Sequence, residues 1–219
     1  MAERLEEIEQ QIQENPYQAL LLLDSVAQAE PDAMSDEAVL SKYILLDAYY
    51  KYRLMEEGAN DSLISIAERY FEAHGSARDV LLCKFLHGVI LCNASRMDTA
   101  LLLFKEAEAV GSQCGDHFLL GRLYGQMSLL CNHLCDADFP RYAEKSMEEF
   151  ALSGDSGFIL DSRINYAISL LGCHQPEKCL ALLNDLLPLA ECLDDTFCLS
   201  KIYTCMGESE ICLQRFDSA

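Results

Sequence analysis

The chain has 219 residues, and 36 Asp and Glu against 16 Lys and Arg give it a formal net charge of −20. Half of the residues are hydrophobic and only 11 are Gly and 5 Pro, which argues against a disordered or linker-rich chain. The acidic excess disfavours a nucleic-acid backbone as partner, because binding phosphates requires clustered Lys and Arg. The longest apolar run, at 5 residues, is far shorter than the roughly 20 that cross a bilayer. We therefore expect no membrane span.

The N-terminal stretch has the pattern of an amphipathic helix. Leu5, Ile8 and Ile12 recur at helical spacing, and the glutamates between them predict a solvated face. Asn15 before Pro16 is typical of a second helix start. Strand signals are nearly absent from the whole sequence, because it contains no Asn-Gly or Asp-Gly hairpin turn. Further helix starts are predicted at Ser35-Asp36-Glu37, at Asp61-Ser62 and at Asp138 before Pro140.

Two markers recur with a period of about 40 residues. Breaks in the helical pattern fall at Gly75-Ser76, Gly115-Asp116, Gly154-Asp155 and Asp194-Asp195. A small residue follows each break at a constant interval: Gly88, Ser128, Ala167 and Gly207. Each unit reads as a helix, a short turn and a second helix. A single helix pair cannot bury its apolar face, so we expect neighbouring pairs to stack into a solenoid.

The small residues have a packing reason, because two helices approach closely only where a side chain is minimal. We expect Gly88 to face Ala100 on the second helix of its pair, with Phe104 and Ala107 following at helical spacing. In the next unit Ser128 is matched by Ala143, with extra residues over 135–139 that lengthen the turn. Pro188 is expected to kink or split the helix in which it stands. His74 and His87 are expected on faces that pack inward.

These residues resemble the tetratricopeptide repeat family. The best matches are Gly88, Ala100, Phe104 and Ala107, together with Tyr203, Met206, Gly207, Phe216 and Ala219. The middle units depart from the family pattern, with Lys84 and Arg163 where a large aromatic residue would stand. Over residues 36–219 the resemblance implies an all-α, right-handed superhelical solenoid of antiparallel helix pairs. Its period of about 40 exceeds the family's usual period of about 34, so the helices are about one turn longer.

The same markers divide the chain into repeats. We expect an N-terminal capping helix pair over residues 1–35, a degenerate repeat over 36–75, tetratricopeptide-like repeats over 76–115, 116–154 and 155–194, and the first helix of a truncated repeat over 195–219. Ala219 would be the first packing residue of a helix that does not follow, which suggests a fragment of a longer protein. The alternative is a short natural terminus or a tail helix that caps the array.

A closer likeness concerns Asp61–Gly75 and the opening Ile8–Leu20. Both stretches resemble envelope-associated repeat proteins of Bacteroidetes-type bacteria, which implies a place in the cell envelope. Members of that group usually begin with a lipoprotein signal and often carry a membrane helix and an effector segment after the repeats. The acidic opening from Met1 does not read as a signal peptide. We expect the protein to lie on the periplasmic side of the envelope, with the signal removed. The alternative location is the cytoplasm, which the free thiols favour.

The eleven cysteines do not form a recognisable site. Their number is odd and no CxxC pair occurs, so we interpret them as small buried apolar residues. Cys131, His133 and Cys135 are poorly placed for one zinc ion, because on a helix His133 points about 200° away from the two thiols. No catalytic constellation or glycine-rich phosphate loop is present. We expect no enzyme activity, no metal and no cofactor.

The leading hypothesis is a protein–protein interaction scaffold, and it places a binding groove on the first helices of successive units. The groove residues follow from register: Leu82, Phe85, Val89, Asn93, Arg122, Leu129, Asn132, His133, Asp161, Ile164 and Ile168. They would bind a peptide or protein segment, as the sensing part of a larger envelope or signalling protein. Several of them could instead belong to the core between repeats. The alternatives are a metal- or redox-responsive protein that uses the cysteine-rich C-terminal half, and a cytoplasmic adaptor.

Overall fold

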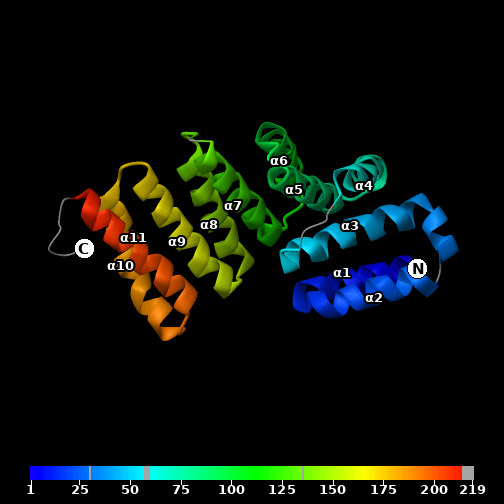
Figure 1. Ribbon diagram of the computed structural model, residues 1–219, viewed down its shortest axis with the longest axis horizontal. Coiled ribbons are helices and arrows are strands. Elements are labelled where there is room, and N and C mark those ends of the chain that lie inside the picture. The colour runs from blue at the N-terminus through cyan, green and yellow to red at the C-terminus, as the bar shows by residue number, and fades with distance from the viewer. Residues whose placement is uncertain (30, 57–59, 135, 214–219) are drawn as a thin grey trace. The chain divides into compact units, whose positions relative to one another are not determined.

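Residues 1–29, 31–56, 60–134 and 136–213 are described by the computed structural model, and every regular element among them is helical. Two compact units divide the chain, unit 1 at Met1–Gly115 and unit 2 at Asp116–Ala219. Within each unit, consecutive helices are joined by short turns and pack side by side (Figure 1). None of the described helices combines the length and apolar character needed to cross a membrane.

Unit 1 is built from six α-helices and one short 3₁₀ helix among its described residues. They are α1 (Ala2–Glu14), α2 (Pro16–Ala29), η1 (Pro31–Ser35), α3 (Glu37–Leu54), α4 (Asp61–His74), α5 (Ala77–Asn93) and α6 (Met97–Gly111). Each helix contacts its successor from α1 to α6, and α1 also packs on α3. The predicted stripe of Leu5, Ile8 and Ile12 is buried in this packing.

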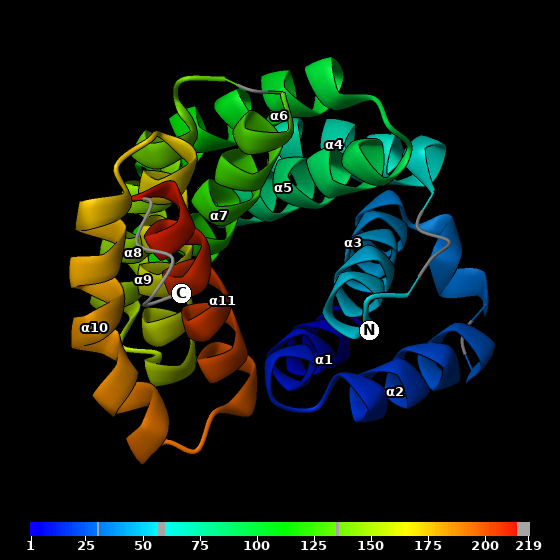
Figure 2. The ribbon, with the colours of Figure 1, turned by 60° about the vertical axis from the view of Figure 1, so that its left-hand side comes forward.

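Unit 2 contains five α-helices in the part of it that the structure describes. They are α7 (His117–His133), α8 (Phe139–Ser153), α9 (Ser156–Gly172), α10 (Pro176–Cys192) and α11 (Thr196–Cys212). The first helices α7, α9 and α11 contact one another in sequence, and α10 packs on both α9 and α11 (Figure 2). The surface of this unit is therefore formed by two rows of helices, the first helices of the pairs and the second helices.

Polar side chains at the breaks start the helices. Ser76 caps α5 in a capping box, in which its hydroxyl accepts from the Asp79 N–H and the Asp79 carboxylate accepts from the Ser76 N–H. The cap of α4 is Asn60, one residue before the predicted Asp61. The side chains of four aspartates at equivalent places accept hydrogen bonds from backbone N–H groups: Asp36, Asp116, Asp155 and Asp195.

Three of the four breaks reverse the chain through a left-handed backbone. Gly115 and Gly154 have φ of +66° and +74°, and Asp194 has φ of +51°. Each stands immediately before the residue that caps the next helix. Glycine adopts this conformation without steric cost and aspartate tolerates it better than most residues. The recurring Gly-Asp and Asp-Asp pairs are thus helix-to-helix turns.

Two helices of unit 1 approach closely at Gly88. A Cβ atom added to Gly88 would lie 2.3 Å from Cε1 of Phe104, which is far inside van der Waals contact. Phe104 is fully buried, as are its neighbours Ala100 and Ala107 on α6. The interior of this helix pair therefore has Gly88 of α5 packed against the Phe104 ring of α6, whereas the sequence predicted Ala100 as the residue that Gly88 faces.

A buried ionic contact connects three helices of unit 1. Glu9 of α1 is only 8% exposed and accepts hydrogen bonds from Lys42 of α3, at 2.6 Å, and from Arg78 of α5. Lys42 also donates to Asp79 at 3.1 Å. Because each charge has an opposite partner, the interior carries these groups without an unpaired charge.

Close packing in unit 2 uses a different set of small residues. A Cβ atom on Gly121 would lie 2.9 Å from the ring of Phe150. The Ser146 hydroxyl donates to the Gly121 carbonyl at 2.8 Å, and the buried Ser128 hydroxyl donates to the Phe139 carbonyl at 3.2 Å. Serine thus stands where the helices nearly touch and satisfies backbone carbonyls of both helices. Cys135, in the lengthened turn, lies outside the described residues.

Among the described residues, no helix covers the corresponding face of α11. Gly207 stands twelve residues after the cap of α11, the position of Gly88 in α5, yet a Cβ atom there would meet nothing within 4 Å. Tyr203 and Ile211 on the same face are 55% and 54% exposed. The predicted partners Phe216 and Ala219 lie outside the described residues.

Two sequence expectations, the splitting of a helix at Pro188 and the inward packing of His74, are wrong, and a kink at Pro188 stays a prediction. α10 is not split at Pro188 but continues through it to Cys192, so the helix tolerates the lost N–H near its C-terminal end. His74 does not pack inward; it is exposed at the end of α4, where its ring stacks on Tyr70. His87 is half-buried and bonded to carboxylates rather than surrounded by apolar groups.

The positions Gly88 and Gly207 offer a matched test of this packing. We expect Gly88→Ala to reduce the free energy of unfolding by about 1–3 kcal/mol, because the new methyl group forces Phe104 from its position. Gly207→Ala should instead be neutral or stabilise by about 0.5–1 kcal/mol, since alanine favours the helix and meets no atom there. Urea denaturation followed by circular dichroism measures both. Equal losses in the two variants would contradict the assigned contact.

Candidate partner-binding surface

Three of the residues assigned to a groove by register lie in the core. Leu82, Phe85 and Ile164 are at most 1% exposed. The ring of Tyr52 on α3 packs edge-on against Phe85, with ring centroids 5.1 Å apart, and Ile164 belongs to the buried cluster between α9, α10 and α11. Inter-helix packing covers these positions, so they are corrected from surface to core and cannot contact a partner in this conformation.

The other two predicted groove residues of unit 1 lie toward the end of α5. Val89 is half-buried and Asn93 is exposed in the last turn of the helix. The rest of the predicted set belongs to unit 2, where the structure brings more of it together.

α7 contributes an exposed apolar residue with polar neighbours. Leu129 is 60% exposed, and Asn132 and His133 are exposed in the following turn. Arg122, two turns before Leu129, lies with its guanidinium 4.9 Å from the centroid of the Phe158 ring. This cation–π contact holds the arginine between α7 and α9.

A hydrogen-bonded polar cluster connects α9 and α11. The Lys201 ammonium donates to the Asp161 carboxylate at 2.7 Å and to Asn165 Oδ1 at 2.8 Å. The Asn165 amide in turn donates to Asp161 Oδ2 at 3.0 Å. All three groups are partly buried, so their geometry is fixed by the two helices and not by solvent.

Register explains why these groups share one side of unit 2. Arg122, Asp161 and Lys201 each stand six residues after the cap of their helix, and Leu129 and Ile168 each stand thirteen after it. Positions that differ by seven share a helix face. We call this set, with Asn132, His133 and Asn165, the first-helix surface of unit 2. Its polar row, made of Arg122, Asp161, Asn165 and Lys201, lies toward the helix starts. Its apolar row, made of Leu129 and Ile168, lies toward the ends of α7 and α9, and the same position in α11 is the exposed Glu208.

Sequence reasoning missed Asn165 and Lys201. The signal for Lys201 was present, because it follows Asp161 by 40 residues and Asp161 was identified. Asn165 lies one turn after Asp161 on the same face. Extending the register into the last helix would have found the polar row.

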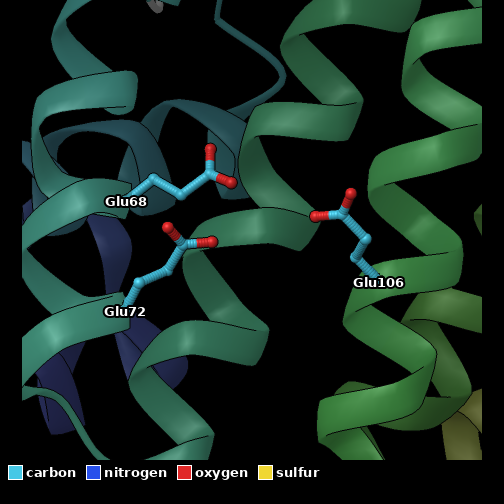
Figure 3. Close-up of side chains that lie close together, drawn as sticks. All are labelled: Glu68, Glu72 and Glu106. Carbon is cyan, nitrogen blue, oxygen red and sulfur yellow. The ribbon is translucent and has the colours of Figure 1, made fainter.

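Unit 1 holds the one group of three potential metal ligands found among the described side chains. Glu68 and Glu72 of α4 and Glu106 of α6 place carboxylate oxygens within 4.8 Å of one another, and Figure 3 shows them directed toward a common space. No cysteine belongs to this group. The Lys84 ammonium donates to all three, at 2.8, 2.6 and 2.8 Å respectively.

Lys84 therefore supplies the cation that the three carboxylates require. Its side chain is 7% exposed. Burial alone would lower the pKa of Lys84, but the hydrogen bonds that it donates to Glu106, Glu68 and Glu72 outweigh burial and raise the pKa. The ammonium stays charged at neutral pH and occupies the centre of the group. A lysine in place of the family's large aromatic residue thus joins α5 to both of its neighbours.

Half of the described cysteines are buried thiols. All ten are free, and five of them are buried. Burial raises the pKa of Cys92, Cys198 and Cys205 to about 11 and also raises that of Cys83 and Cys179. A raised pKa lowers the thiolate fraction, and the thiolate is the reactive form. Only Cys192 and Cys212 are exposed.

Comparison with known proteins identifies the fold. No family profile and no curated protein matches the sequence. The crystal structure of apo RapI superposes with a TM-score of 0.78 over 98% of this chain at 14% identity. The structure of a Rap protein complexed with competence and sporulation factor gives 0.71 over 97% at 16% identity. The chain spans about 60% of the length of either structure. At this identity the likeness establishes the fold: an all-α, tetratricopeptide-like helical solenoid.

Replacing the internal cation should destabilise unit 1. We expect Lys84→Met to reduce the free energy of unfolding by about 1–3 kcal/mol, because three neighbouring carboxylates lose their common partner while two of them remain partly hydrated. Adding Glu68→Gln, which removes the least exposed of the three charges, should recover part of the loss. Urea denaturation measures both variants. A double variant no more stable than Lys84→Met would contradict the charge-compensation account.

Thiol labelling should separate the cysteines into two classes. With Ellman's reagent at about pH 8, we expect Cys192 and Cys212 to react first in the folded protein and the five buried thiols to react only after unfolding. The measurement is the number of protein thiols that react in the fast phase, with and without denaturant. Fast reaction of Cys179 or Cys198, located by mass spectrometry, would show that these residues are accessible and would favour a redox role.

Proposed function

We propose that this chain is a non-enzymatic protein-interaction scaffold that binds a segment of a partner protein on the first-helix surface of unit 2. The observation that carries the proposal is Leu129, which is 60% exposed, with the half-buried Ile168 at the equivalent position of α9. An exposed apolar side chain next to ordered polar groups is what an interface core needs.

The polar row suits a peptide backbone and mixed side chains. Arg122, Asp161 and Lys201 alternate in sign, and Asn165 adds an amide, so donors and acceptors stand along one side of the surface. An extended segment carries both kinds of group along its main chain. The row has one more positive than negative charge, although the chain as a whole carries −20. The overall acidity therefore does not restrict the surface to basic partners.

The fold supports the same proposal. A Rap protein with this type of solenoid was solved in complex with competence and sporulation factor. A helical solenoid of this class can thus hold a bound factor, and we extend that property to this chain as part of the proposal. The metal- or redox-responsive alternative gains no support, because Lys84 fills the acidic group and burial raises the pKa of the interior thiols.

Exposed leucines on the two rows of helices provide the test. Peptides are first selected from a displayed library for binding to the wild-type protein. They should bind the Leu129→Asp variant at least about tenfold more weakly, a change of about 1.4 kcal/mol in the binding free energy, because the carboxylate would enter the apolar row. Calorimetry with one selected peptide measures the affinity. Asp161→Asn should also weaken binding, by changing the pairing of Lys201.

Leu152→Asp is the matched control. Leu152 is 65% exposed but lies on α8, a second helix, so the same substitution there should leave the affinity unchanged. Circular dichroism checks that both variants are folded. If Leu152→Asp weakened binding as much as Leu129→Asp, or if no peptide were enriched, the assignment of this surface would be wrong.

We further propose that the scaffold works in an envelope or signalling protein. The support is the resemblance of residues 61–75 to envelope-associated repeat proteins. Fractionation of the source cells with an antibody against the chain tests this setting. Recovery in the envelope fraction is expected, and recovery with soluble cytoplasmic protein would support the adaptor alternative.

A further inference from the structure

His87 bridges two carboxylates of the preceding helix. Its Nδ1 lies 2.5 Å from Glu68 Oε2, and its Nε2 lies 2.7 Å from Asp61 Oδ1. Asp61 is the first residue of α4 and Glu68 stands two turns later, so a single ring on α5 contacts α4 at both places. The imidazole side chain is 12% exposed.

This geometry requires the doubly protonated ring. A neutral imidazole has one N–H, so it can donate to only one carboxylate and must direct a lone pair at the other. An imidazolium donates from both nitrogens. Each contact is then a charge-assisted hydrogen bond, which is stronger than a neutral one.

The surrounding charges favour the proton. On α4, Glu68 and Glu72 face the same region as Asp61, and α6 adds Glu106. The neighbouring cations are Lys84, which serves Glu68, Glu72 and Glu106, and Arg96 at the start of α6, which donates to Asp61 at 2.8 Å. From α3, Lys42 pairs with Asp79 two turns before His87, and Tyr52 packs on Phe85. Four carboxylates thus share two permanent cations, and protonated His87 is a third.

We propose that His87 is a pH-operated latch that holds α4 on α5 when protonated and releases the N-terminal end of α4 when it loses its proton. α4 packs between α3 and α5, so the release would change how these two helices are spaced. The latch lies in unit 1 and is independent of the binding surface proposed for unit 2. Its failure would leave that proposal untouched.

The direction of the pH effect follows from the contacts. Burial alone would lower the pKa of His87, but the hydrogen bonds with Glu68 and Asp61 outweigh it and raise the pKa. The same contacts lower the pKa of Asp61 and of Glu68. A raised pKa means that the latch contributes fully below the ordinary histidine value of about 6.5 and is lost as the pH rises through the folded-state value.

Amide hydrogen exchange in the full chain tests the latch. After correction for intrinsic exchange rates, amides in the first half of α4 should exchange faster at about pH 8.5 than at about pH 5.5, because the protonated ring that holds this end of α4 is lost between these values. Amides of α9 serve as an internal reference. In His87→Gln the difference in α4 should disappear, while the exposed His74→Gln should keep it.

A titration of His87 in the wild-type protein gives a second test that does not depend on whether His87→Gln folds. The imidazole resonances of His87 in the wild type should show both ring nitrogens protonated at about pH 6 and titrate above the ordinary histidine value of about 6.5. In Asp61→Asn that midpoint should fall. A neutral His87 at pH 6, or equal α4 exchange at both pH values, would overturn the proposal.

Discussion

The fold depends on how closely the two helices of each pair can approach. At Gly88 the α5 backbone meets the Phe104 ring so closely that no Cβ atom fits, and at Gly121 the α7 backbone meets Phe150 in the same way. Close packing of this kind fixes the rotation of each helix about its axis. The rotation then decides which side chains are buried and which remain on the surface. The first-helix surface is a consequence of where these small residues stand.

That rotation also decides where ionic side chains meet. Lys84 is directed by α5 into the space between α4 and α6, where three carboxylates surround it. Glu9 similarly meets Lys42 and Arg78 where three helices converge. Buried ion pairs add little net stability but penalise any arrangement that separates them. In unit 1 these pairs therefore oppose any register between the helices that would separate the charges.

The fold could be predicted from the sequence because the same two local features recur in successive repeats. Gly-Asp and Asp-Asp breaks combine a left-handed turn with a helix cap, and both leave a visible pattern. The surface was less predictable, since a register position alone does not reveal burial. Leu82 and Leu129 were assigned to one groove, yet packing buries the first and exposes the second. The ionic contacts of Lys84 and Glu9 were missed because their partners are 12 to 69 residues apart and follow no period.

The two units differ in the residues that occupy equivalent positions of their first helices. Position six after the cap is the buried Leu82 in α5 but Arg122, Asp161 and Lys201 in α7, α9 and α11. Position eight is the buried Lys84 in α5, where it binds carboxylates of two neighbouring helices. Unit 1 thus carries ionic groups in contacts between α4, α5 and α6, and unit 2 carries Asp161 and Lys201 in a contact between α9 and α11. Since position six holds an apolar core residue in one unit and charged residues in the other, its side chain can change from repeat to repeat while the helical repeat is kept.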